Sequence, residues 1–171
     1  HDPSKIHNLF AQLKSKFISH LGASFQGLPD DYIKLAFASV LAYEMKPYGS
    51  STATSLPDLL AANSLNREGY ALLTWYLFRI MSPKWSTDVD MIGWNGSGTG
   101  ARTQLMIKQP GVDAMIVEPV VAHLAMIGSL DNLTDGGPID RQDQASFYSR
   151  GGLNWYRGQL TTALSDGQFR A

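Results

Sequence analysis

The sequence predicts an α+β fold in which helices pack against a small antiparallel β-sheet. Up to residue 81, apolar residues recur at three- and four-residue steps, the period of amphipathic helices. Between residues 89 and 118, short apolar stretches are divided by turns that contain glycine and proline, which indicates strands. The chain of 171 residues is long enough for one domain with a substantial core. We expect one domain over 1–171, with an amino-terminal helix in 1–27, a core in 28–130, and a loop and closing element in 131–171.

Two long helices and one short helix are expected before the centre of the chain. The first begins near Asp2 or Ser4 as its cap, and it buries one apolar stripe made of Ile6, Leu9, Phe10, Leu13, Phe17 and Leu21. The second begins after Leu28, with acidic residues in its first turn, where they suit the positive end of the helix dipole. A short helix over 58–62 is capped by Ser55.

The segment 67–81 is apolar on nearly all sides, which predicts a central helix that ends before Pro83. A strand is expected over 89–94, followed by a glycine-rich loop over 95–100 that we interpret as a flexible rim. Strands over 102–108 and 114–118 flank a Pro-Gly turn, so we expect an antiparallel pair. The segment 120–130 is expected to continue as a helix or a buried segment, and Asp131 to Gln144 as a surface loop.

Composition excludes several classes of function. The formal net charge is −1 and 17% of residues are charged, without a basic block of the kind that binds nucleic acid. The longest apolar run is too short to span a bilayer, and no signal peptide is visible, so we expect a soluble chain of undetermined location. There is no cysteine, which excludes disulfides, thiolate metal sites and a thiol nucleophile. No histidine pair has metal-ligand spacing, so we expect neither a metal nor a cofactor.

The start of the central helix and the later strands carry an ordered set of motif remnants. The residues from Arg67 to Ala71 read Arg-Glu-Gly-Tyr-Ala; Arg102 lies 35 positions after Arg67, and Glu118, followed by a proline, lies 16 positions after Arg102. Over residues 28 to 125 this order resembles the transglutaminase-like superfamily of papain-like cysteine enzymes. That family has Cys-x-Gly-Tyr-Ala at a core helix, a histidine on one strand and an aspartate-proline end on the next. The resemblance places Arg67, Arg102 and Glu118 at the positions of the cysteine, histidine and aspartate.

The resemblance therefore implies a degenerate member of the family that has no catalytic residues. Arginine is not a nucleophile, and its pKa above about 12 prevents it from acting as a base at neutral pH. An alternative is an acyl-transfer or hydrolytic enzyme in which Ser64 or Thr103 replaces the cysteine. His123 follows Glu118 by five positions, and the ordinary interpretation of it is a partly buried residue.

We expect a binding or scaffold module, of a kind found within larger bacterial toxins, effectors or assembly proteins. The anticipated site gathers Arg67, Arg102 and Glu118, with Glu68 beside Arg67 and Gln104 on the same strand face as Arg102. Two guanidinium groups at a helix start predict a protein partner or acidic ligand that offers a carboxylate or phosphate. Two further interpretations remain open: a structural ion-pair cluster of these arginines and glutamates, and a structural or coat-type interaction protein. The oligomeric state is not predicted.

Overall fold

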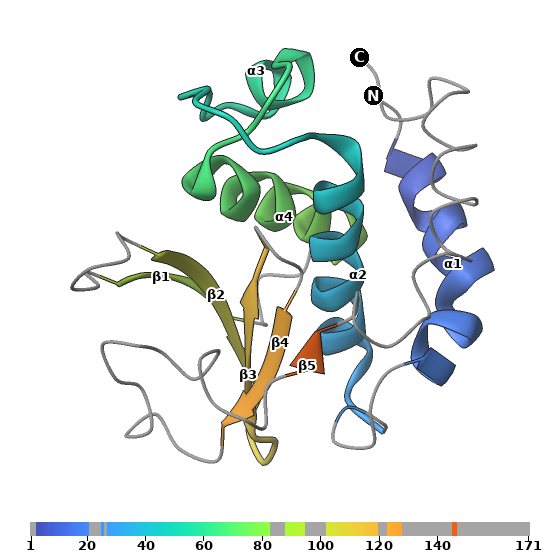
Figure 1. The fold of residues 1–171 in the computed structure, drawn as a ribbon. Coiled ribbons are helices and arrows are strands. Elements are labelled where there is room, and N and C mark those ends of the chain that lie inside the picture. The colour runs from blue at the N-terminus through green and yellow to red at the C-terminus, as the bar shows by residue number, and fades with distance from the viewer. Residues whose placement is uncertain are drawn as a thin grey trace.

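The computed structural model describes residues 3–20, 25, 27–82, 88–94, 102–119, 123–127 and 145–146, and it confirms the α+β class. Four helices precede five strands: α1 (Pro3–His20), α2 (Asp30–Met45), α3 (Leu56–Ala61), α4 (Arg67–Met81), β1 (Asp88–Trp94), β2 (Arg102–Lys108), β3 (Ala114–Glu118), β4 (His123–Ile127) and β5 (Ala145–Ser146). Figure 1 shows α1, α2 and α4 gathered on one side of the sheet. No helix among these residues is both long enough and apolar enough to cross a membrane.

The strands form one sheet in sequence order, β1-β2-β3-β4-β5, and every neighbouring pair is antiparallel. The predicted hairpin of β2 and β3 is confirmed. Its turn is closed by a 3.1 Å hydrogen bond from the backbone N–H of Val112 to the carbonyl of Gln109. Gly111 has a φ of 78°, the value that a type II turn requires after Pro110.

The helix α4 is central, as predicted. It contacts α1, α2, α3 and β2, while α2 also contacts β3. The face of the sheet toward the helices contributes to their common core through Leu105, Ile107, Met115, Val117 and Leu124. The predicted stripe of α1 is buried at Ile6, Leu9, Phe10, Leu13 and Phe17, and Leu21 lies outside the described residues.

The opposite face of β2 and β3 is also buried, although its residues do not belong to the helical core. Met106, Ala114 and Ile116 are 8%, 3% and 0% exposed and lie outside that cluster. Because side chains alternate along a strand, they share a face with Gln104 and Glu118. The sheet therefore has a helical face and a second buried face, which we call the far face.

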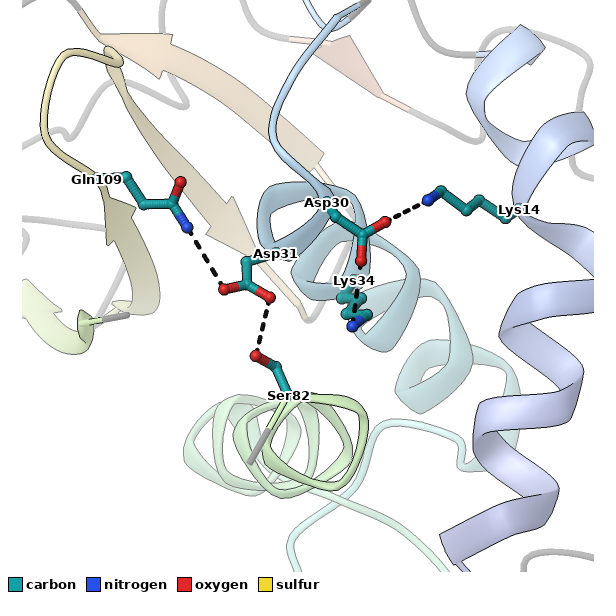
Figure 2. A network of polar contacts seen from close by, with 6 residues as sticks. All are labelled: Lys14, Asp30, Asp31, Lys34, Ser82 and Gln109. Carbon is teal, nitrogen blue, oxygen red and sulfur yellow. Dashed lines mark hydrogen bonds and ion pairs between the residues drawn. The ribbon is translucent and has the colours of Figure 1, made fainter. Parts of the chain in front are cut away.

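The first turn of α2 joins three other elements (Figure 2). Asp30 accepts a hydrogen bond from Lys14 of α1 and forms a 3.1 Å ion pair with Lys34. Burial alone would raise the pKa of Asp30, but the hydrogen bonds and charges of the two lysines outweigh it and lower that pKa. Asp31 accepts from Ser82, which follows α4, and from the Gln109 side chain at the end of β2. These contacts fix α2 against both layers.

Two expectations about secondary structure need correction. Of the two alternatives for 120–130, the helix is wrong for residues 123–127, which form strand β4; Leu124 is buried in the helical core and Met126 packs against it, as a buried segment requires. The short helix is α3, which begins two residues earlier than expected, although Ser55 does cap it by accepting from the N–H of Asp58. The rim over 95–100, the loop over 131–144 and the closing element after residue 146 lie outside the described residues.

Candidate binding site at the start of the core helix

The start of α4 is held by a side-chain cap and by a close backbone approach. Asn66 caps the helix, and its Oδ1 accepts a 2.7 Å hydrogen bond from the N–H of Gly69. A Cβ at Gly69 would lie 3.2 Å from that oxygen and 3.3 Å from the Cβ of Leu65. Glycine at this position therefore lets the chain fold tightly over the opening turn.

Tyr70 ties this turn to the segment that follows α2. Its ring is buried, and its hydroxyl donates a hydrogen bond to the carbonyl of Lys46. Burial, with a smaller contribution from Tyr43, raises the pKa of Tyr70 to about 12. The ammonium of Lys46 in turn donates to the carbonyls of Leu60 and Ala62, each at 2.6 Å, at the end of α3. Lys46 thus links α2, α3 and α4.

A short parallel bridge between Tyr48 and Leu65 brings the loop after α2 beside the residues that precede α4. Gly49 donates its N–H to the carbonyl of Leu65 at 2.9 Å, and it packs directly on the side chain of Ser64. Tyr48 itself is 61% exposed, the one large apolar side chain of the described residues that is so open to solvent. The start of α4 is therefore bordered by an exposed aromatic ring.

Arg67 and Glu68 form the first turn of α4 and have no partner among the described residues. Arg67 is half-buried and Glu68 is exposed, and in the described part of the chain neither makes a hydrogen bond or an ion pair. Within the described residues, Arg67 and Glu68 therefore do not take part in the structural ion-pair cluster that was the alternative interpretation. Asn66 satisfies one N–H of the helix end, and Arg67 adds a cation that has no anionic partner among the described residues.

The remaining predicted residues belong to the far face of the sheet. Gln104 is 0% exposed and Glu118 is 5% exposed, and each has a polar partner. Leu105 pairs with Val117 and Met106 with Ile116, so one further step in this register sets Gln104 opposite Glu118. Arg102 pairs with Trp94 and precedes Gln104 by two positions on the same strand. The register therefore brings Gln104 and Glu118 to the far face, whereas Arg67 and Glu68 belong to the helical layer.

Thr103 occupies the position that faces the helices. It is half-buried and shares its parity with Leu105 and Ile107, both of which belong to the helical core. His123 is the strand partner of Glu118.

The pairing of His123 with Glu118 is the main feature that the sequence interpretation missed. The sequence offers no periodic signal for it, because Leu124 to Ile127 are four apolar residues in a row, which suits a buried strand as well as a buried helix. A four-residue connection, 119–122, joins β3 to β4 and places the two residues opposite each other.

The described residues contain no group of three or more His, Asp or Glu side chains arranged to hold a metal ion, and the whole chain has no thiol. No protein-family model, curated protein or solved structure matches this chain.

Proposed function

We propose that this chain is a transglutaminase-like domain that has lost the thiol chemistry of that superfamily and serves as a binding or scaffold module. The opening turn of α4 carries this proposal. Gly69 and Tyr70 retain the motif residues and hold the helix start in place, whereas the position of the nucleophile is Arg67. The scaffold is thus kept without the reactive group.

The loss extends to geometry as well as to residue type. A cysteine enzyme of this kind needs its base within hydrogen-bond reach of the nucleophile. Here position 102 lies an even number of residues from Met106, and position 118 an even number from Ile116. Both Met106 and Ile116 lie outside the core that the sheet forms with α4. Replacement of the three residues supports a non-thiol function, whereas the alternation at positions 102 and 118 departs from the geometry of the superfamily.

The ligand that fits the start of α4 is a carboxylate or phosphate group of a protein partner or acidic ligand. Arg67 presents a planar guanidinium that binds such groups through two parallel hydrogen bonds. It lies two positions beyond Leu65, whose bridge partner Tyr48 exposes its ring to solvent. A cation in the turn that follows this bridge suits an acidic group carried on a partly apolar segment.

The test is a thermal-shift and calorimetric titration of the full chain with phosphate, sulfate and an acidic peptide. We expect saturable stabilisation that Arg67→Ala removes. Lys5→Ala, which deletes an exposed cation on α1, is the matched control and is expected to leave the response intact. Equal responses from the native chain and Arg67→Ala would reject the start of α4 as the binding site.

A further inference from the structure

An extended segment, residues 47–54, connects α2 to α3. It contains neither a turn nor a bend, and the residues that flank it, Lys46 and Ser55, both have extended backbone angles. From residue 48 onward the exposure of its residues alternates, with Tyr48, Ser50, Thr52 and Thr54 exposed and Gly49, Ser51 and Ala53 half-buried. This alternation is the pattern of a β-strand that turns one face to solvent.

The start of this segment is paired along one edge. The N–H of Gly49 donates to the carbonyl of Leu65 at 2.9 Å, and the carbonyl of Pro47 accepts from the N–H of Leu65 at 3.0 Å. In an extended chain, successive residues direct their N–H and C=O groups to opposite edges of the strand. The main-chain groups of Ser50 and Thr52 therefore lie on the edge away from Leu65.

That second edge is open in the part of the chain that the structure describes. Neither the N–H nor the carbonyl of Ser50 or Thr52 bonds to a described residue. Thr54 marks the end of the open stretch, because its carbonyl accepts a 3.3 Å hydrogen bond from the hydroxyl of Tyr76 on α4. Charged side chains commonly protect strand edges from added strands, but residues 47–54 include no charged residue. The edge is therefore suited to accept another strand.

Arg67 gives this edge a preference for one kind of strand. It opens α4 two positions beyond Leu65, the bridge partner of Tyr48, and it has no anionic partner among the described residues. A second copy of residues 47–54 would bring no carboxylate to this end, since the segment has no acidic residue. Charge complementarity thus favours an extended segment of another protein with an acidic residue near the Tyr48 end.

We propose that an extended, acidic segment of a partner protein binds along residues 48–54 by β-strand addition. Main-chain hydrogen bonds to Ser50 and Thr52 supply affinity, whereas Arg67 and the exposed ring of Tyr48 select the side chains of the partner. This inference rests on the proposed function, because it names the class of partner for the same site. At about 3.3 Å per residue, a partner segment of about six residues covers the open edge.

The experiment is a calorimetric titration of the full chain with two blocked peptides of about six residues, in which threonine and valine alternate and a glutamate stands first or last. The two orders match parallel and antiparallel addition, and we expect one of them to bind. Thr52→Pro removes an N–H of the open edge and is expected to weaken binding by at least about fivefold. Thr52→Ala keeps that N–H and is expected to bind within about twofold of the native chain. Equal affinities of these two variants, or no binding of either peptide, would overturn the proposal.

Modified peptides test the same edge without a change in the protein, so they decide the question even where Thr52→Pro alters the melting curve. The tighter peptide is N-methylated at its odd or at its even positions. An added strand turns alternate amides toward its neighbour, so we expect one version to lose affinity by at least about tenfold and the other to bind as the parent does. Loss in both versions, or in neither, would reject strand addition.

Two further measurements separate this inference from its alternatives. If Arg67→Ala weakens binding while the two N-methylated peptides bind alike, the proposed function stands and strand addition fails. Pairing with a second copy would give a dimer in light scattering that Thr52→Pro dissociates and Thr52→Ala retains, and this result would reject the partner segment. We expect the two variants to have the same mass in the absence of peptide.

Discussion

The hydroxyl of Ser82 donates a 2.8 Å hydrogen bond to Oδ1 of Asp31, and it thereby joins the end of α4 to the first turn of α2. Ser82 is only 5% exposed, and its own N–H also closes the last turn of α4 on Phe78. We expect Ser82→Ala to reduce the free energy of unfolding by about 1.5–3 kcal/mol, the range for a hydrogen bond to a charged group. Denaturant unfolding measures this change.

The control for that prediction is Ser19→Ala, which removes an exposed serine hydroxyl from α1. It is expected to change stability by less than about 0.5 kcal/mol. A double-mutant cycle of Ser82→Ala with Asp31→Asn is expected to show coupling, since the two residues share one contact. Strictly additive effects would show that this hydrogen bond contributes nothing to the junction.

Gly49 and Ser64 are packed so closely that a larger residue at position 49 has no room. A Cβ on Gly49 would lie 2.3 Å from Oγ and 2.4 Å from Cβ of Ser64. We expect Gly49→Ala to destabilise the protein by about 1–3 kcal/mol, the usual cost of overpacking. Because the clash includes the Cβ of Ser64, Ser64→Gly is expected to restore much of the loss in the double variant, whereas Ser64→Ala restores little. Thermal unfolding of Gly49→Ala and of the two double variants decides this.

The buried hydroxyl of Tyr70 makes stability fall at alkaline pH. Burial raises its pKa to about 12 from an ordinary value of 10.0. Between these values the unfolded chain releases the proton while the folded chain retains it, so the stabilising contribution is complete below pH 10 and is lost as pH rises toward 12. We expect Tyr70→Phe to be less stable at pH 7 by about 0.5–1.5 kcal/mol, through loss of the bond to Lys46.

The same variant is expected to lose stability less steeply than the native chain between pH 10 and 12. Part of the slope remains, because burial also raises the pKa of Tyr32. Parallel stability curves for Tyr70→Phe and the native chain over this interval would contradict the assignment of the alkaline transition to Tyr70.

The helices and the β2–β3 hairpin could be predicted because each is specified locally. The stripe of α1, the acidic first turn of α2 and the Pro110-Gly111 turn are short-range patterns with direct physical causes. Strand β4 could not be separated from a helix, since its five residues are too few for periodicity to decide. Its pairing with β3 depends on a register that only the assembled sheet reveals.

The candidate site was harder to predict for the same reason. Motif spacing gives the order of Arg67, Arg102 and Glu118 but not the face of the sheet on which each strand residue lies. A shift of one residue in the pairing register of a strand moves each side chain to the opposite face of the sheet. Positions 102 and 118 are assigned to the far face because Leu105 and Val117 belong to the helical core. The sequence alone does not show which strand residues join that core.

Restoring the motif residues tests how far the resemblance to transglutaminase-like enzymes extends. Arg67→Cys introduces a thiol in the first turn of α4, where the helix dipole favours the thiolate. We expect this thiol to react with a thiol reagent faster than the control thiol of Ser19→Cys, which lies at an exposed position of α1. Adding Arg102→His and Glu118→Asp is expected to raise this rate by less than about twofold, because those positions share the far face and a histidine there lies across β2 from α4. A gain of tenfold or more in the triple variant, absent from either partial combination, would show that the three positions converge and that this sheet retains the geometry of a cysteine enzyme.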